Sequence, residues 1–311
     1  MNIVFAGTPP FTLPCLKALH LSEHHISAIY TQPDRPAGRG RKLQQSAVKT
    51  WAEPLNIPIH QPQNFKTNDA IDTLAKLKPD LMVVIAYGLI LPQAILDIPR
   101  FGCINVHASL LPKWRGASPI QHAILHGDNE SGVTIMQMDA GMDTGAIYTQ
   151  ATCPIHSHDT SQQLHDRIAE LAAQPLLTTI EAIAAQSAHP EQQNNSLATY
   201  APKISKQDAA INWSKSALEI DRKIRAFTPW PICFTHVGDQ AMRVFKSEVI
   251  NQTTHKPPGT IIALDKCGML VATGHGCLLI DSIQFPGGKP LSIADWLNAN
   301  RPQLHLNLVL K

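Results

Sequence analysis

The sequence predicts an α/β protein in which a doubly wound, mostly parallel sheet is followed by a small β-barrel. Short apolar runs alternate with helical patterns up to about residue 185, which predicts the parallel sheet. The run from Leu81 to Ala86 is apolar throughout, as expected of a strand buried on both faces. Beyond a polar stretch, short strand-like pieces separated by Gly, Pro and Asp predict the barrel.

The elements of the first region follow from this pattern. Pro10 and Pro119 stand where proline suits the first turn of a helix, and Pro79 ends another helical pattern. We expect strands over 3–7, 26–31, 81–86, 104–106 and 133–138, and helices over 11–20, 69–78, 118–126 and 161–185. The crevice of such a sheet lies at the carboxyl ends of its strands, so residues that follow the strands are the candidate site.

The second region begins after residues 187–206, which are rich in Gln, Asn, Ser and Pro and typical of a linker or exposed loop. We expect a helix over 216–227 and strands over 233–237, 241–249, 259–264, 269–273 and 277–284. Their spacing does not distinguish one kind of small barrel from another. The predicted organisation is a first domain over residues 1–188, a linker over 189–206 and a second domain over 207–311.

Composition narrows the class of protein. The chain has 311 residues, of which 44% are apolar, so it can bury a hydrophobic core. Its formal net charge is only +2, so overall charge does not indicate a protein that binds polyanions. It has no apolar run long enough to span a bilayer and no secretory signal at its start, which predicts a cytoplasmic protein without a membrane partner. Its six cysteines form no C-x-x-C pair, so we expect no metal site.

Three side chains form the candidate catalytic group. Asn105 and His107 lie two residues apart on a predicted strand and therefore point to the same face. Asp143 lies in a Gly-flanked loop, from which a carboxylate can fold back toward a histidine. An amide that holds an oxyanion, an imidazole that moves a proton and a carboxylate that orients it suit acyl transfer to an amine. Singly, each residue is more often structural, and the loop can instead make Asx turns.

Two ligand classes are excluded by motif. The turn Gly7-Thr8-Pro9-Pro10 after the first strand is not G-x-G-x-x-G, and no Walker lysine follows it. We therefore expect neither an NAD nor an ATP site. The loop over 139–145 lacks the alternating oxygen ligands and closing Glu of a calcium loop.

A basic run follows the second predicted strand. Arg35, Arg39, Arg41, Lys42 and Lys49 occur with no acidic residue between them. Such a run can contact nucleic acid, because attraction to phosphates dominates the affinity. Charge alone favours the plainer interpretation of a solvated loop.

The motif N-x-H-x-S-L-L-P over 105–112, followed by D-x-G-x-D-T-G over 139–145, resembles the signature of formyltransferases that use 10-formyltetrahydrofolate. Blocks over 3–9, 31–42, 200–204 and 224–231 resemble the branch of this family that formylates methionyl initiator tRNA. The similarity covers nearly the whole chain. Pro10 departs from the family, in which an acidic residue is usual at this position.

The resemblance implies a Rossmann-like catalytic domain, an OB-like barrel and a reaction. The formyl group of 10-formyltetrahydrofolate would pass to the α-amino group of methionyl initiator tRNA, giving N-formylmethionyl-tRNA for translation initiation. Asn105 would donate to the oxyanion with help from His107. Asp143 would accept a hydrogen bond from His107, or from a water that shuttles protons from the amine to N10. Folate contacts are implied at Ser109, Leu110, Leu111, Pro112, Tyr87 and Gly88.

The resemblance also implies a nucleic-acid partner. The basic loop would enter the acceptor stem of the tRNA, with Arg39, Arg41 and Lys42 as candidates. The tRNA backbone would follow the second domain, with Lys203 and Lys206 as leading contacts and further cations at Arg222, Lys223, Arg225, Arg243 and Lys246. We expect a monomer.

Other functions share parts of this pattern. A sugar-amine formyltransferase uses the same donor and also carries a second domain, which makes it the nearest alternative. A glycinamide ribonucleotide formyltransferase resembles only the first domain. A formyl-folate hydrolase would deliver the formyl group to water, and a non-catalytic RNA-binding module would not need Asn105, His107 and Asp143 together. The basic loop and the block over 200–204 favour tRNA.

Overall fold

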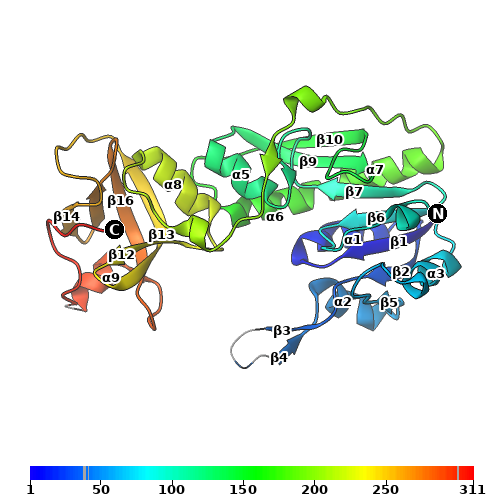
Figure 1. Cartoon of the computed structure of the whole chain (residues 1–311), viewed down its shortest axis with the longest axis horizontal. Helices are drawn as coiled ribbons and strands as arrows, with labels where there is room; N and C mark the ends of the chain where they lie inside the picture. The colour runs from blue at the N-terminus through cyan, green and yellow to red at the C-terminus, as the bar shows by residue number, and fades with distance from the viewer. Residues whose placement is uncertain (38–39, 41, 300) are drawn as a thin grey trace. The chain divides into compact units, whose positions relative to one another are not determined.

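The computed structural model describes residues 1–37, 40, 42–299 and 301–311. Figure 1 follows the chain through two compact units. The first unit comprises Met1–Pro119, Glu130–Pro154 and His165–Ala201. The second comprises Ile120–Asn129, Ile155–Leu164 and Pro202–Lys311. The domain boundaries expected from the sequence stay predictions. Of the expected linker, residues 189–201 belong to the first unit and residues 202–206 to the second.

A seven-stranded sheet forms the centre of the first unit, in the order β10-β9-β7-β6-β1-β2-β5. The strands from β7 to β5 are parallel, and β9 and β10 are antiparallel additions at one edge. Their bounds are β1 Asn2–Gly7, β2 His25–Tyr30, β5 Ile59–His60, β6 Leu81–Ile85, β7 Cys103–His107, β9 Glu130–Gln137 and β10 Ile147–Pro154. The mostly parallel α/β sheet is confirmed.

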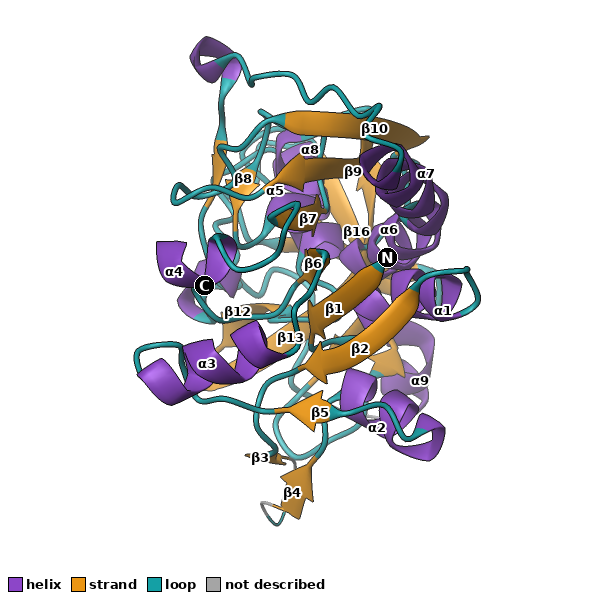
Figure 2. Cartoon of the chain, turned by 90° about the vertical axis from the view of Figure 1, so that its right-hand side faces the viewer, coloured by secondary structure: helices purple, strands orange, loops and turns teal. Residues whose placement is uncertain are grey.

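Helices cover both faces of this sheet, as Figure 2 shows, with α1 and α7 on one side and α3 and α4 on the other. All residues of β6 are buried, which explains its continuous apolar sequence. In chain order, the helices up to residue 184 are α1 Leu13–His20, α2 Ala47–Ala52, α3 Asn68–Lys76, α4 Gln93–Leu96, α5 Pro119–His126, α6 Ser161–Leu171 and α7 Ala173–Ala184. Nearly all of α5 and the first residues of α6 belong to the second unit.

The helix expected over 161–185 is two helices, which is a correction to the sequence pattern. The break lies at Ala172. Pro175 has no N–H to donate to the carbonyl of Leu171, and its ring crowds that carbonyl, so a continuous helix is disfavoured. Three further features were not predicted from the sequence pattern. They are β10, the short parallel pair of β8 Arg115–Gly116 and β11 Tyr200–Ala201, and the hairpin of β3 Arg35–Ala37 and β4 Lys42–Gln44.

The carboxyl ends of β1, β6 and β7 lie side by side. Gly7 pairs with Ile85, and Val84 pairs with Asn105. Because the three strands are parallel, the segments that leave them emerge at one edge of the sheet. Thr8 ties two of these segments together, since its hydroxyl donates to the carbonyl of Tyr87 at 2.9 Å.

The second unit is built on an antiparallel sheet in the order β12-β13-β16-β15-β14, with β17 beside β16. Its elements are α8 Ala217–Ala226, β12 Cys233–Val237, β13 Gln240–Ile250, β14 Ile261–Asp265, β15 Gly268–Ala272, β16 Cys277–Gln284, β17 Leu291–Ser292 and α9 Ile293–Asn298. The five expected strands are present. The chain end joins the two edge strands, because Lys311 pairs with His236 of β12 and Leu308 accepts from Ile261 of β14. Among the described residues, no helix is long and apolar enough to cross a membrane.

Candidate active site

Asn105, His107 and Asp143 come together at the carboxyl end of β7. Asn105 Nδ2 lies 3.5 Å from Asp143 Oδ1, and His107 Nδ1 lies 3.6 Å from the same oxygen. The other carboxylate oxygen, Oδ2, accepts from the backbone N–H of Gly116 at 2.8 Å. One oxygen is therefore bound by the backbone, and the other faces the amide and the imidazole.

The environment of His107 determines which ring nitrogen can exchange a proton. Its side chain is buried, and Nε2 lies 3.0 Å from the carbonyl oxygen of Trp114. A carbonyl only accepts, so we assign the proton of the neutral imidazole to Nε2. Nδ1 is then the ring nitrogen with the free lone pair, and it faces Asp143.

The loop that carries Asp143 has a backbone shape that its sequence explains. Asp143 has φ +55°, in the left-handed region that residues other than glycine adopt uncommonly. A Cβ on Gly145 would collide with the carbonyl oxygen of Gln137, so only glycine fits there. Asp139 stabilises the turn, since its Oδ1 accepts from Gly141 N at 3.0 Å and from the Thr144 hydroxyl at 2.7 Å. The first aspartate of D-x-G-x-D-T-G thus stabilises the loop, and the second faces the site.

The turn over 109–112 is held from within. Ser109 is buried and donates to the carbonyl of Lys113 at 2.6 Å. The hydroxyl of Thr134 donates to the carbonyl of Ser109 at 2.7 Å and accepts from Leu111 N at 3.0 Å. Leu111 is buried as well, whereas Leu110 and Pro112 are partly exposed. Ser109 and Leu111 therefore shape this turn, and the accessible surface comes from Leu110 and Pro112.

A cavity of about 410 Å³ adjoins the segment after β6. The ring of Tyr87 is buried, and among the described atoms its hydroxyl has no hydrogen-bond partner. Burial raises the pKa of this hydroxyl above its ordinary value. The backbone at Tyr87 and Gly88 therefore lines the cavity while the ring packs in the core. The other lining residues come from the ends of β1, β2 and β6 and from the base of the hairpin: Thr8, Pro9, Gln32, Pro33, Arg35, Gln44, Gln45, Ser46 and Ala86.

The predicted tRNA contacts are only partly described. Arg39 and Arg41 lie outside the described residues, and Lys42 belongs to β4 of the hairpin that Figure 1 shows projecting from the first unit. Lys203 and Lys206 are exposed in the segment after Ala201.

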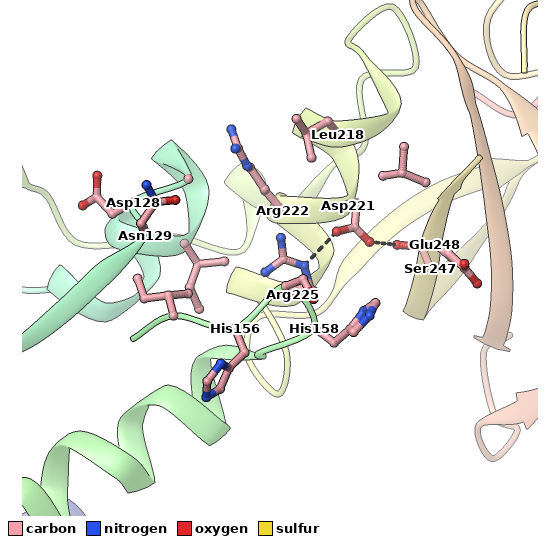
Figure 3. A pocket seen from close by; sticks show the side chains of 15 residues that line it. Asp128, Asn129, His156, His158, Leu218, Asp221, Arg222, Arg225, Ser247 and Glu248 are labelled. Atoms are coloured by element: carbon pink, nitrogen blue, oxygen red, sulfur yellow. Dashed lines mark hydrogen bonds and ion pairs between the residues drawn. The ribbon is translucent and has the colours of Figure 1, made fainter. Parts of the chain in front are cut away.

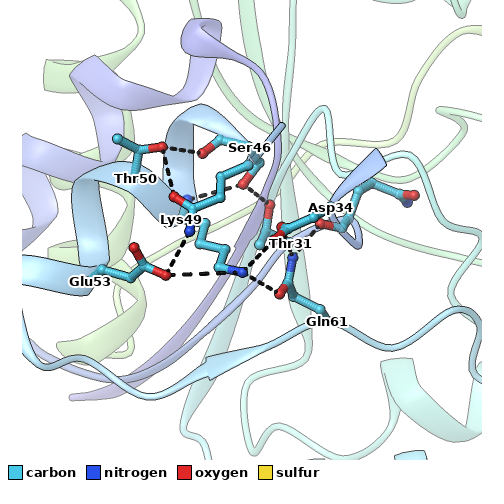
Figure 4. A network of polar contacts seen from close by, with 9 residues as sticks. Thr31, Asp34, Ser46, Lys49, Thr50, Glu53 and Gln61 are labelled. Carbon is cyan, nitrogen blue, oxygen red and sulfur yellow. Dashed lines mark hydrogen bonds and ion pairs between the residues drawn. The ribbon is translucent and has the colours of Figure 1, made fainter. Parts of the chain in front are cut away.

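A polar network closes the base of this hairpin (Figure 4). Lys49 Nζ lies 2.7 Å from Asp34 Oδ2 and 3.0 Å from Gln61 Oε1. Gln61 Nε2 donates to Asp34 Oδ1 at 2.8 Å, and the Ser46 hydroxyl accepts from Lys49 N at the start of α2. The hydrogen bonds from Lys49 and Gln61 lower the pKa of Asp34. Lys49, the last cation of the basic run, is therefore paired within the protein.

The second unit contains a cavity of about 390 Å³ that sequence reasoning did not identify (Figure 3). Arg225 Nε contacts Asp221 Oδ2 at 2.7 Å, and the Ser247 hydroxyl donates to Asp221 Oδ1 at 2.9 Å. This chain of contacts joins α8 to β13. Arg222 also lines the cavity, and a Cβ on Gly127 would collide with its guanidinium.

Comparison with known proteins agrees with this geometry. Residues 1–180 match the formyl transferase family, and residues 203–301 match the formyl transferase C-terminal domain. The chain is 60% identical to a methionyl-tRNA formyltransferase of Legionella pneumophila (strain Paris) over 100% of its length and 99% of that protein. The chain belongs to the methionyl-tRNA formyltransferase family. The enzyme of this name from Ectopseudomonas mendocina is 52% identical to it, covering 100% and 98% of the two chains.

Solved structures share the fold of this formyltransferase at lower identity. WlaRD, a sugar 3N-formyl transferase solved in the presence of dTDP and 5-N-formyl-THF, aligns with a TM-score of 0.68 and 22% identity, over 93% of this chain and 99% of that one. HypX from Aquifex aeolicus in complex with tetrahydrofolic acid aligns with a TM-score of 0.65 and 17% identity, over 96% and 47%. These likenesses show the formyltransferase fold.

Sequence reasoning missed the residues that surround Asp143. Gln193 donates to the carbonyl of Asp143, and Arg115 donates to Gln193. The backbone N–H of Gly116 donates to the Asp143 carboxylate. The turn Trp114-Arg115-Gly116, which closely follows the motif over 105–112, is the local signal that could have found Arg115 and Gly116. Gln193 lies in a polar stretch with no local signal.

No cluster of His, Cys, Asp and Glu suited to a metal ion occurs within the described ranges.

Proposed function

We propose that this formyltransferase moves the formyl group of 10-formyltetrahydrofolate to the α-amino group of methionyl initiator tRNA. Identity of 60% over the full length to a methionyl-tRNA formyltransferase supports the acceptor. The observation that carries the chemistry is the meeting of Asn105 and His107 at one oxygen of Asp143, at 3.5 and 3.6 Å.

The reaction needs a bond to form, a proton to move and a bond to break. The neutral amine attacks the formyl carbon and a tetrahedral oxyanion forms. The amine then loses a proton, N10 of the folate gains one, and the bond between carbon and N10 breaks. The products are the formylated amine and tetrahydrofolate, so atoms and charges balance.

Asn105 suits the role of oxyanion donor. Its hydrogen bond to Asp143 is 3.5 Å long, at the outer limit for such a bond, so the amide gives up little by turning toward a better acceptor. A donor held at a fixed place in a partly buried site stabilises developing negative charge more than water does, and Asn105 needs only to rotate its amide.

Asp143 and His107 suit the proton transfer. Gly116 N occupies Oδ2 of the carboxylate, which leaves Oδ1 to accept a proton from the amine directly, through a water or through His107. Nε2 of His107 is bound to Trp114, so its exchangeable position is Nδ1, facing Oδ1. The protonated imidazole would add positive charge beside the oxyanion.

The donor would lie along the carboxyl edge of the sheet. The backbone at Tyr87 and Gly88 lines the cavity there, and Leu110 and Pro112 offer apolar surface on the neighbouring turn. For the tRNA we propose Arg39, Arg41 and Lys42 at the acceptor stem and Lys203 and Lys206 along its backbone. The monomeric state and the cytoplasmic location stay predictions.

The test compares acceptors for one donor. Purified protein and 10-formyltetrahydrofolate are mixed with methionyl initiator tRNA, methionyl elongator tRNA or a free amino sugar, and the formylated product is measured. Rapid formylation of the initiator tRNA alone is expected. Transfer to the sugar, or release of formate to water, would retain the folate site and refute the tRNA acceptor.

A further inference from the structure

The segment from Glu191 to Ala201 packs along the catalytic loop and its supports. Glu191 and Ile147 exchange backbone hydrogen bonds of 2.7 and 2.8 Å, just after the Asp143 loop. Tyr200 and Ala201 pair with Arg115 and Gly116, the residues beside the carboxylate. The stretch that looks like a linker in the sequence is thus part of the site's framework.

Gln193 of this segment bonds the loop directly. Its Nε2 donates to the carbonyl of Asp143 at 2.9 Å and to that of Gly145 at 2.8 Å. Its Oε1 accepts from Arg115 Nε at 3.0 Å and from Arg115 Nη2 at 2.7 Å. A carboxamide has two N–H donors and an oxygen with two lone pairs, so every hydrogen-bonding position of Gln193 is used.

Arg115 holds Gln193 in this orientation. Arg115 as a whole is 2% exposed, and its Nη2 also donates to Asn195 Oδ1 at 2.7 Å. Because a guanidinium only donates, it makes the amide oxygen face Arg115 and the amide nitrogen face the loop. Both ends of the contact are buried, since Gln193 is 9% exposed.

We propose that Gln193, oriented by Arg115, is a positioning residue for formyl transfer. Two of its bonds hold the carbonyls on either side of the turn that keeps Asp143 at φ +55°. This backbone shape directs the carboxylate to Asn105 and His107. Without the two bonds, the loop relaxes toward commoner backbone shapes and the carboxylate leaves its place. This inference rests on the proposed function of Asp143 and goes beyond it.

Gln193→Met is the direct test, since it keeps the length of the side chain and removes its donors and acceptor. We expect kcat to fall by about tenfold to a hundredfold, the usual effect of a small misplacement of a reacting group. KM for the tRNA and for the folate should stay within about twofold, because Gln193 is buried and has no free hydrogen-bonding position to offer either of them. Gln192→Met is the matched control, since Gln192 is an exposed amide in the same segment, and it should leave kcat unchanged.

A double substitution separates positioning from a general structural defect. If Gln193 acts through Asp143, adding Gln193→Met to Asp143→Asn should not reduce the remaining kcat further. A loss that multiplies in the double variant would overturn the proposal, as would a kcat of Gln193→Met equal to that of the unaltered enzyme. If the unaltered enzyme does not formylate methionyl-tRNA, the proposed function fails instead.

A readout without turnover tests the same point. The N–H of Gly116 is held by the Asp143 carboxylate, so its hydrogen exchange reports whether that carboxylate stays in place. Exchange at Gly116 should be faster in Gln193→Met and unchanged in Gln192→Met. Equal exchange rates in Gln193→Met and the unaltered protein would refute the positioning role whatever acceptor the enzyme uses.

Discussion

Replacing Asn105 by alanine removes the amide donor that we place at the oxyanion while leaving the rest of the site intact. In the resting protein this amide makes one hydrogen bond of 3.5 Å, too long to contribute much to folding. We therefore expect the free energy of unfolding to fall by less than about 1 kcal/mol. Loss of an oxyanion donor costs about 2.7–4 kcal/mol of transition-state stabilisation, or about a hundredfold to a thousandfold in kcat.

Asn105→Asp provides the matched comparison. Aspartate has nearly the shape of asparagine, but it replaces the donor by a second carboxylate at 3.5 Å from Asp143. Two like charges so close disfavour each other, and the added charge opposes an oxyanion. Activity should fall further than in Asn105→Ala.

The assay is single-turnover formylation of methionyl initiator tRNA with saturating 10-formyltetrahydrofolate, beside urea unfolding of each variant. A rate for Asn105→Ala within about threefold of the unaltered enzyme would refute the oxyanion assignment. A large loss of stability would refute the claim that Asn105 contributes little to folding.

Three further predictions concern the frame of the site and the protein's surface. Thr134→Val removes a buried hydroxyl that bonds two backbone groups of the turn over 109–112, and should lower the free energy of unfolding by about 2–4 kcal/mol in urea titrations. The contact with Lys49 lowers the pKa of Asp34 in the folded protein below its value of about 3.8 in the unfolded chain. The ionised Asp34 therefore stabilises the folded protein above about pH 3.8, and this contribution is lost as the pH falls through the lower folded pKa. Asp34→Asn should therefore be less stable than the unaltered protein at pH 7, and the difference should shrink below about pH 4 in thermal melts. Thiol reagents should modify Cys267 rapidly in the native protein and the five buried cysteines only after unfolding, which mass spectrometry can count.

The first part of the fold was predictable because its signals are local. Strands buried on both faces have continuous apolar sequences, and the helices between them have apolar residues spaced every three to four positions. The break at Ala172 shows where this reasoning stops, because the helical pattern continues through it and only the missing N–H of Pro175 marks it. The hairpin over 35–44 was missed since its strands are short and polar, and its base is held by side chains from elsewhere.

The sequence by itself determined which side chains are the candidates for the chemistry. Asn105 and His107 share a face because a strand has a period of two, and the glycines around Asp143 allow the backbone shape it adopts. Family resemblance then pointed to formyl transfer. All of these are properties of short stretches of chain.

The tertiary structure alone decided how those side chains are held. Asp143 meets Asn105 across 38 residues of sequence, and Gln193 reaches the carbonyl of Asp143 across 50. The groups that bind the loop from outside include the backbone N–H of Gly116 and a carboxamide in a polar stretch. Backbone N–H and C=O groups occur at nearly every residue, so contacts made to them leave no pattern in the sequence, and only the fold selects which of them meet.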